Sequence, residues 1–405
     1  MSERRPGVRE EIVRRERAAL MPNYRRLPVE LVRGEGVYLY DHAGRAYLDC
    51  IAGISVSNLG HCHPDVVAAI RAQAGRLIHC SNLFYTEPMI ELAEWIRDRS
   101  LGGKVFFCNS GTEANEAALK LVRKHAGPSR PEIVALVNGF HGRTYGALSI
   151  TGQAAKQEAF RPLLPGVRFV EPDDAAGLEA AVGERTAAIV VEIIQGEIGV
   201  HPLDPGFLRL ARALADRYGA LLVVDEIQTG LSRTGTLFAY QGVGVEPDVM
   251  SLAKSLGGGM PIGAIVARPE LSDVFQPGEH GSTFAGSPLA CAAGLAACRA
   301  LEDPDLLAHV RRAGARLLAG LQAVVEAGDA AEARGRGLMC AIDLIEPRAA
   351  DGVRWLLEEG ILANNTTPRT IRFLPPLVIS EAEIDRVVDA VARMARAFAG
   401  GAAAT

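Results

Sequence analysis

Short apolar runs alternate with amphipathic stretches between residues 104 and 266. The runs are rich in β-branched and aliphatic residues and span residues 105–108, 133–137, 167–170, 188–193, 220–224, 247–250 and 262–266. Near-continuous apolar strands of this kind are typical of a mainly parallel sheet that is buried on both faces. Stretches such as residues 112–125 and 205–218 have helical periodicity and predict the covering helices. The pattern therefore predicts an α/β fold with a large domain around a seven-stranded, mainly parallel sheet.

The pattern changes after about residue 300. It predicts a long helix at residues 305–327, a strand at 337–344, a helix at 352–359, extended segments near 361 and 371, and a last helix at 381–399. This mixture is typical of a smaller α+β domain. We therefore expect a large domain at residues 61–300 and a small domain at residues 301–405.

The first sixty residues contain a basic helix and two short strands. The strands, at residues 36–40 and 46–50, flank the turn Asp41-His42-Ala43-Gly44. We expect this N-terminal segment, residues 1–60, to pack with the small domain.

The composition argues against several classes of protein. The 405 residues carry a net charge of −5 and the pI is about 6.0, so we expect no nucleic-acid partner. Seven scattered cysteines, an odd number, favour reduced thiols over a disulfide framework. The charged N-terminus has no apolar leader, and no run of about 18 apolar residues occurs. We therefore expect a cytoplasmic protein that does not enter a membrane.

The triplet His61-Cys62-His63 contains three residue types that bind metals. Adjacent residues of an extended chain point to opposite sides, however, and no fourth ligand follows at metal-site spacing. We interpret the triplet as a polar turn before Pro64 and expect no metal site. Cys291 and Cys298 lie on a helix of small residues and are expected to face the core.

Asp225 and Lys254 each follow a predicted strand. Ligands of open α/β sheets bind outside the carboxyl ends of the strands, so we expect both side chains at one edge of the sheet. A lysine amine can link covalently to the aldehyde of pyridoxal 5'-phosphate, and an aspartate can keep the pyridine nitrogen protonated. Because most lysines are solvated surface charges, this prediction depends on the pair and its surroundings together.

The motif Asn109-Ser110-Gly111-Thr112-Glu113 follows a strand and opens a helix. Backbone N–H groups at a helix N-terminus bind phosphate, and the hydroxyl groups of Ser110 and Thr112 add donors. The alternative is a capping box with Ser110 or Thr112 as the cap. Lys254 favours the phosphate interpretation. No GxGxxG motif lies in a first strand–helix–strand unit, which argues against a nicotinamide enzyme.

Two further groups follow strands or lie in loops. Phe140 could stack on a flat cofactor ring and Arg143 could clamp a carboxylate, although core packing and a surface ion pair are the simpler local interpretations. Ser282 and Thr283 lie in a glycine-flanked loop and could donate hydroxyls or form an ordinary turn.

Glu192 and Glu197 flank a Gln-Gly pair at a strand end, and Arg372 begins an apolar run far along the chain. A buried carboxylate and a distant arginine can form a switchable ion pair. The pattern alone does not bring the two together.

Taken together, these motifs resemble the class III, or ω-amino-group, branch of the fold type I pyridoxal phosphate aminotransferases. The resemblance covers about residues 23–396 and includes Asn58-Leu59-Gly60-His61, Ser81-Asn82-Leu83-Phe84-Tyr85, Asn109 to Glu116, Phe140 to Thr144, Gln195-Gly196-Glu197, Asp225 to Gly230, Leu252-Ala253-Lys254 and Gly281 to Phe284. Ordered motifs over this length are specific for the fold and the cofactor and less specific for the substrate.

The resemblance implies roles in cofactor binding. Lys254 is expected to carry the cofactor and, once freed, to move a proton between substrate and cofactor carbons. Asp225 pairs with the ring nitrogen, Gln228 approaches the phenolic oxygen and Phe140 stacks on the ring. The phosphate is held by Ser110, Gly111 and Thr112 and by Thr283 of the neighbouring subunit. A homodimer with shared active sites follows from this expectation.

The resemblance also implies roles in substrate binding. Arg143, with Ser282 nearby, is expected to bind the remote carboxylate of the substrate. Arg372 binds the α-carboxylate of glutamate, and Glu197 masks that arginine when an ω-amino donor occupies the site. Masking is needed because the same pocket accepts a donor without a charge near the reacting carbon and an acceptor with a carboxylate there. With the donor bound, a buried arginine without a counter-charge would be unfavourable in free energy.

The implied activity is transfer of the δ-amino group of N2-acetyl-L-ornithine to 2-oxoglutarate, a step of arginine biosynthesis. Alternatives are other donors (ornithine, succinylornithine, 4-aminobutyrate or carrier-bound lysine) or an aminomutase or racemase of the same fold. Possession of Arg143 together with Glu197 and Arg372 favours two alternating substrates and hence transamination.

Four positions depart from the family pattern. Ile193 and Ile198 stand where proline and glycine are usual, Ser232 where glycine is common, and Ser287 in place of asparagine. None removes a group that performs chemistry. Ile198 adds bulk beside Glu197 and could narrow or reshape the donor pocket.

Overall fold

The computed structural model describes residues 7–400. Its central sheet has seven strands: β4 (Val105–Cys108), β5 (Glu132–Leu136), β6 (Val167–Val170), β7 (Thr186–Val191), β10 (Leu221–Asp225), β11 (Val249–Leu252) and β12 (Gly263–Ala267). Their order is β4-β12-β11-β10-β7-β5-β6, and only β12 runs antiparallel to its neighbours among these pairings. The predicted α/β class and the mainly parallel seven-stranded sheet are confirmed.

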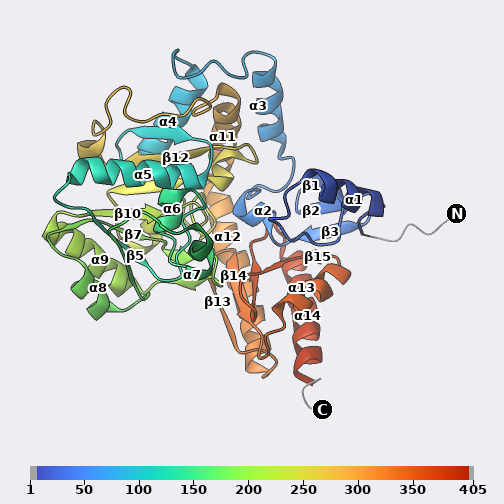
Figure 1. Ribbon diagram of the computed structural model, residues 1–405. Helices are drawn as coiled ribbons and strands as arrows, with labels where there is room; N and C mark the ends of the chain where they lie inside the picture. Colours follow the sequence, from blue (N-terminus) through green and yellow to red (C-terminus); the bar gives the residue numbers. More distant parts are fainter. Residues whose placement is uncertain (1–6, 401–405) are drawn as a thin grey trace.

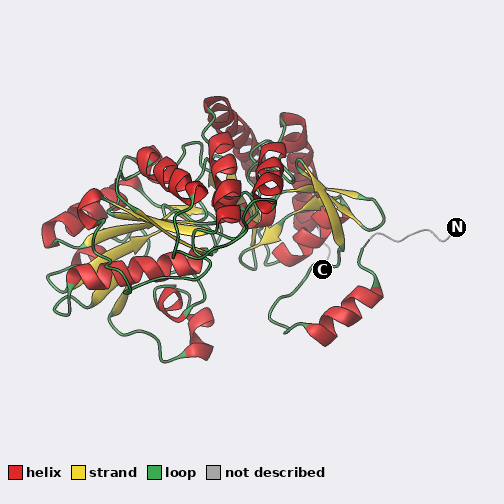
Figure 2. Cartoon of the chain, turned by 90° about the horizontal axis from the view of Figure 1, so that it is seen from above, coloured by secondary structure: helices red, strands yellow, loops and turns green. Residues whose placement is uncertain are grey.

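Both faces of this sheet are covered because successive strand residues point to opposite sides. Ile133 and Ala135 pack in one cluster with helix α5 (Gly111–Ala126). Val134 and Leu136 pack on the other face with helices α8 (Ala175–Ala181) and α9 (Pro205–Tyr218). Figure 2 shows helices on both sides of the strands. The continuous apolar runs of the sequence are the result of this double burial.

The large-sheet part of the chain contains further helices. They are α3 (Pro64–Ala74), α4 (Glu87–Arg99), α6 (Tyr145–Ser149) and α11 (Pro288–Leu301). Short elements are α2 (Ala52–Ser55), α7 (Ala154–Gln157), α10 (Ala239–Val243), β8 (Ile194–Gln195), β9 (His201–Pro202) and the 3-10 turns η1 (Glu158–Phe160), η2 (Lys254–Gly257) and η3 (Pro269–Leu271). Cys291 and Cys298 are buried on α11, as expected.

A second sheet lies in the C-terminal part of the chain. It contains β13 (Glu332–Arg336), β14 (Met339–Asp343), β17 (Thr370–Phe373) and β16 (Asn364–Asn365), flanked by helices α12 (Pro304–Glu326), α13 (Ala349–Glu358) and α14 (Glu381–Gly400). The strand predicted at residues 337–344 begins only at Met339, because Gly337, with φ +56°, makes the hairpin turn. The charged strand β13 was not predicted.

The N-terminal strands form a third sheet with a strand from the C-terminal part. Strands β1 (Leu31–Glu35), β2 (Tyr38–Asp41) and β3 (Ala46–Asp49) follow helix α1 (Glu10–Ala19), and β15 (Ile361–Leu362) pairs with β3 in parallel. In Figure 1 these elements lie together with α13 and α14, apart from the central sheet. The domain limits at residues 60 and 300 remain a prediction, and both outer ends of that division fall outside the described residues.

The triplet at residues 61–63 has a structural role in this N-terminal region. His61 forms an isolated bridge with Gly36, and its Nε2 lies 2.7 Å from the Asp49 carboxylate. Within residues 7–400, no group of three or more His, Cys, Asp or Glu side chains is arranged to hold a metal ion. In the same range, no helix is both long and apolar enough to cross a membrane.

Arg233 joins three parts of the chain. Its side chain is fully buried, and it donates hydrogen bonds to Ser55 Oγ (3.0 Å), to Asn58 Oδ1, and to the carbonyl oxygens of Leu338 (2.9 Å) and Pro375 (2.6 Å). Burial lowers the pKa of Arg233 to about 9, so the guanidinium remains charged at neutral pH. These oxygen acceptors stabilise the buried charge. Without the Arg233 side chain, the same oxygen atoms would lose their hydrogen-bond donors.

Replacing Arg233 by methionine is therefore expected to destabilise the fold by about 3 kcal/mol, because buried acceptors lose their partners. Chemical denaturation followed by circular dichroism measures the change. Arg209→Met, at an exposed position of α9, is the matched control and is expected to change stability by less than about 0.5 kcal/mol. Equal denaturation midpoints for the two variants would contradict the inference that Arg233 stabilises the contact between these three parts of the chain.

Candidate active site

A cavity of about 470 Å³ lies where several strands of the central sheet end. Its lining includes side chains from the ends of β4, β5, β10 and β11, as expected for a sheet of this type. The predicted site residues that line it are Ser110, Gly111, Thr112, Phe140, Arg143, Glu197, Asp225, Gln228 and Lys254. The structure therefore brings most of the predicted site together.

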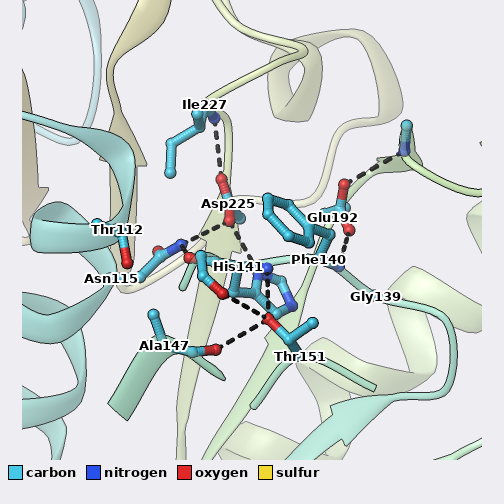
Figure 3. Close-up of polar contacts among 12 residues, drawn as sticks. Thr112, Asn115, Gly139, Phe140, His141, Ala147, Thr151, Glu192, Asp225 and Ile227 are labelled. Atoms are coloured by element: carbon cyan, nitrogen blue, oxygen red, sulfur yellow. Dashed lines mark hydrogen bonds and ion pairs between the residues drawn. The ribbon is translucent and has the colours of Figure 1, made fainter. Parts of the chain in front are cut away.

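Asp225, at the end of β10, is fixed by three donors (Figure 3). Its Oδ2 lies 2.8 Å from His141 Nδ1 and accepts a 2.8 Å hydrogen bond from Asn115 Nδ2, while Oδ1 accepts one from the Ile227 N–H at 3.0 Å. Burial alone would lower the pKa of His141, but its hydrogen bond with Asp225 raises it overall. His141 and Asn115 together hold the Asp225 carboxylate in one orientation.

Glu192 holds the chain around Phe140. One carboxylate oxygen accepts a hydrogen bond from the Phe140 N–H at 2.8 Å and the other accepts one from the Gly196 N–H at 3.3 Å (Figure 3). Burial raises the pKa of Glu192 to about 7. The side chain thus links the loop that carries Phe140 to the segment that carries Glu197.

Lys254 begins the 3-10 turn η2, directly after β11 and Ala253. Its φ of +50° lies in the left-handed region, which costs a residue other than glycine about 1 kcal/mol or more. Burial lowers the pKa of the amine, which increases its neutral, nucleophilic fraction. Both effects are typical of a reactive lysine.

The N-terminus of α5 combines capping with an open first turn. Ser110 is the N-cap and accepts a 3.4 Å hydrogen bond from the Glu113 N–H. The Thr112 hydroxyl accepts hydrogen bonds from the N–H groups of Arg143 and Thr144, each at 3.1 Å. A Cβ atom at Gly111 would lie 2.8 Å from the Ile227 side chain, so only glycine fits this approach. The first-turn N–H groups of a helix have no intrahelical acceptor and suit a phosphate.

These features fit pyridoxal 5'-phosphate. A lysine with a lowered pKa, a carboxylate oriented by three donors, and a helix N-terminus at a glycine all line the same cavity. The predicted positions are Lys254 for covalent attachment, Asp225 for the ring nitrogen and the α5 N-terminus for the phosphate. These individual roles remain predictions.

Arg372, on β17, meets Glu197 although 175 positions separate them. Arg372 Nη1 donates to Glu197 Oε1 at 2.7 Å, to Gln228 Oε1 at 3.1 Å and to the Gly196 carbonyl at 2.9 Å. Burial alone would raise the pKa of Glu197, but the charges of Arg372 and Lys254 and the hydrogen bonds from Arg372 and Gln228 together outweigh burial and lower it to about 2. Arg372 Nη2 is buried and has no hydrogen-bond partner among residues 7–400. The ion pair that the sequence suggested is formed and leaves one donor available.

Three predicted residues lie outside the lining of this cavity. Arg372 lies behind Glu197 and contacts it directly. Ser282 accepts a 2.9 Å hydrogen bond from Asn109 Nδ2, and Thr283 is exposed. Their loop is therefore not part of this chain's own cavity wall, and the assignment of Thr283 to a neighbouring subunit remains a prediction.

Sequence reasoning assigned no role to three residues of this region. His141 and Asn115 hold Asp225, and both lie inside motifs that the sequence had singled out. Lys156, from α7, lies with its Nζ 5.5 Å from the centroid of the Phe140 ring. No local pattern distinguishes Lys156 from a solvated surface lysine.

The structure explains one departure from the family pattern. Ser232 has a φ of +74°, a conformation that favours glycine, and its hydroxyl donates a 2.5 Å hydrogen bond to the Leu301 carbonyl. This bond offsets the backbone strain. Ile198 does not line the cavity, and its effect on the donor pocket remains a prediction. Ser287 occupies the N-cap position of α11 without a side-chain capping bond, and its hydroxyl donates to the Ile78 carbonyl at 2.9 Å.

Known proteins resemble the chain over nearly its whole length. The family model described as aminotransferase class-III matches residues 19–395. The acetylornithine aminotransferase of Caldanaerobacter subterraneus subsp. tengcongensis is 47% identical over 380 residues, which cover 92% of this chain and 96% of that protein. The acetylornithine aminotransferase of Methanocaldococcus jannaschii is 44% identical over 91% of this chain and 94% of that protein.

Solved structures agree with this assignment. The ornithine aminotransferase of Toxoplasma gondii ME49 superimposes with a TM-score of 0.92 at 37% identity, covering 97% of this chain and 96% of that one. The N-acetylornithine aminotransferase of Stenotrophomonas maltophilia K279a gives a TM-score of 0.82 at 35% identity, covering 96% of this chain and 100% of that one. The protein therefore belongs to the class-III aminotransferases, enzymes that depend on pyridoxal 5'-phosphate.

Proposed function

We propose that the protein transfers the δ-amino group of N2-acetyl-L-ornithine to 2-oxoglutarate, giving N-acetylglutamate semialdehyde and glutamate. The observation that carries this proposal is the Arg372–Glu197 ion pair beside Lys254, with Arg143 also on the cavity wall. It is supported by relatives at 44–48% identity that are acetylornithine aminotransferases. The product places the enzyme in arginine biosynthesis.

The cofactor, when bound, supplies an electron sink that stabilises negative charge on the substrate carbon. Lys254 would hold it covalently and, once released, would carry the proton that leaves one carbon and joins another. Asp225, held by His141 and Asn115, would keep the ring nitrogen protonated. Phe140 would contact the ring, and Gln228, which also contacts Glu197 and Arg372, would serve its oxygen substituent.

The ion pair allows one pocket to serve two substrates. With the ω-amino donor bound, Glu197 neutralises the buried Arg372, which would otherwise face an uncharged part of the donor. When glutamate or 2-oxoglutarate binds, its α-carboxylate takes the place of Glu197, and the free Nη2 allows a two-pronged contact. Arg143 binds the remote carboxylate in both cases.

We also propose a homodimer with active sites at the interface. Large apolar side chains are exposed in the segment 78–85 and at two further positions, namely Ile78, Leu83, Phe84, Tyr85, Tyr145 and Phe284. Exposed apolar groups of this size mark an interaction surface. Thr283, next to Phe284, is also exposed and is available to a neighbouring subunit's phosphate site. Light scattering at micromolar concentration tests this: a mass of one chain would contradict the proposal.

The choice of donor is tested by steady-state kinetics with 2-oxoglutarate. We expect N2-acetyl-L-ornithine to give the highest kcat/KM in a panel with L-ornithine, N2-succinyl-L-ornithine and 4-aminobutyrate. Free ornithine is the second candidate, because the Toxoplasma gondii ornithine aminotransferase has the same fold at a TM-score of 0.92. A clearly higher kcat/KM for ornithine or 4-aminobutyrate would refute the proposed donor.

Changing Glu197 to glutamine is expected to affect the two half-reactions in opposite directions. Without its neutralising carboxylate, Arg372 is left uncompensated against the ω-amino donor, so kcat/KM for that half-reaction falls about tenfold or more. The half-reaction with glutamate is retained or accelerated, because Arg372 no longer has to be unmasked. Single-turnover absorbance changes with each amino acid measure the two rates. An equal decrease in both would show that Glu197 does not act as a switch.

A further inference from the structure

Two positive side chains lie over one aromatic ring at the cavity wall. Arg143 Cζ lies 5.7 Å from the centroid of the Phe140 ring, and Lys156 Nζ lies 5.5 Å from the same centroid. Lys156 is half-buried on the short helix α7, and Gln153 accepts a hydrogen bond from its amine. Phe140 and Arg143 line the cavity, whereas Lys156 is not among its lining residues and approaches it at the Phe140 ring.

The two charges are close enough to affect each other. Burial lowers the pKa of Lys156, repulsion by Arg143 lowers it further, and attraction by Glu197 opposes the shift. Within residues 7–400, neither Arg143 nor Lys156 forms an ion pair with a carboxylate. Glu197, the carboxylate that attracts Lys156, is already paired with Arg372. An anionic ligand near both cations relieves the repulsion between them.

We propose that Lys156 and Arg143 together bind the remote carboxylate of the amino donor, and that Lys156 determines specificity for N-acylated donors. This inference deepens the proposed function and depends on it for the identity of the donor. A carboxylate that faces two cations gains more than one that faces a single arginine.

The same pair of cations disfavours a free α-amino group. In L-ornithine, the α-ammonium is attached to the carbon that bears the carboxylate, so it lies beside Arg143 and Lys156 and is repelled by both. Acylation removes that positive charge and leaves the carboxylate unchanged. The site therefore selects the acylated donor by electrostatics, before any contact with the acyl group itself.

The kinetic test compares N2-acetyl-L-ornithine with L-ornithine as donor. In Lys156→Met, the kcat/KM for N2-acetyl-L-ornithine divided by that for L-ornithine is expected to fall about tenfold. The change is expected mainly in KM, because one of two cations is lost. Lys156→Arg keeps the charge and is expected to restore the ratio to within about threefold of the unchanged protein. Lys104→Met, at an exposed position paired with Asp273, is the matched control and leaves the ratio unchanged. A Lys156→Met ratio within twofold of that control would overturn the inference.

A binding test separates this inference from the proposed function. N-acetyl-L-norvaline carries the acyl group and the carboxylate but no δ-amine, and N-acetyl-L-norvalinamide lacks the carboxylate as well. Calorimetry on the holoenzyme is expected to show about tenfold weaker binding of the acid by Lys156→Met and unchanged binding of the amide. Equal effects on acid and amide would overturn the inference. If acetylornithine proved a poor donor in the unchanged enzyme, the proposed function would fail, while the acid-versus-amide comparison would still decide the role of Lys156.

Discussion

Replacing Lys254 by alanine is expected to reduce kcat by more than about 10³-fold, because a single side chain provides both the covalent attachment and the proton transfer. Lys254 has a left-handed backbone conformation, and burial lowers the pKa of its amine. The variant is expected to bind the cofactor through its phosphate and ring contacts only. Borohydride reduction followed by intact-mass measurement distinguishes the two states.

The mass of the reduced, unchanged protein should increase by one cofactor, and that of Lys254→Ala should not. Lys104→Ala, at an exposed position of the same chain, is the control and should retain both the added mass and the activity. Retention of the added mass by Lys254→Ala would identify another lysine as the attachment point and would refute this part of the site.

Changing Asp225 to asparagine is expected to lower kcat by about 10²- to 10³-fold, because it removes a fixed negative charge at a reacting group. The amide oxygen can still accept from His141 and Asn115, so the side chain remains in place while its charge is lost. The pKa of His141, which is raised by this carboxylate, is expected to fall in the variant. Proton NMR of the buried imidazole reports that change independently of activity.

Asp248→Asn provides a matched control for Asp225→Asn. Asp248 is also a buried acid of the central sheet, but it pairs with Arg212 and Arg268 and does not line the cavity. Its replacement is expected to lower thermal stability and to leave kcat largely unchanged. If Asp225→Asn lost stability without losing kcat, its carboxylate would be structural and the predicted role at the ring nitrogen would be wrong.

The central sheet was predictable because its strands are buried on both faces and therefore consist of uninterrupted apolar residues. Strand β13 (Glu332–Arg336) has no such signal. It pairs along one side with β14, and Arg334 folds back to form an ion pair with Asp343 of that strand. Its existence depends on tertiary contacts that no local pattern contains.

The same distinction applies to the candidate site. Asp225 and Lys254 follow strands, so the rule that strand ends form the ligand edge brought them together. His141 contacts Asp225 across 84 positions, and Arg372 contacts Glu197 across 175, so their meeting depends on the folded chain. Lys156 is the extreme case, because its significance arises only from its position over Phe140.

The pairing of β15 with β3 has a consequence for how the protein is made. Among residues 7–400, the parallel partner of Leu48 is Ile361, so the N-terminal sheet cannot be completed until some 300 further residues have been synthesised. At about 5–20 residues per second, the ribosome needs roughly 15–60 s for that length. During this interval the edge of β3 is unpaired, and Tyr47 and Leu48, which are buried in the finished protein, lack their final cover. The nascent chain is therefore most exposed to aggregation at its oldest end, and chaperone binding is expected to be concentrated there.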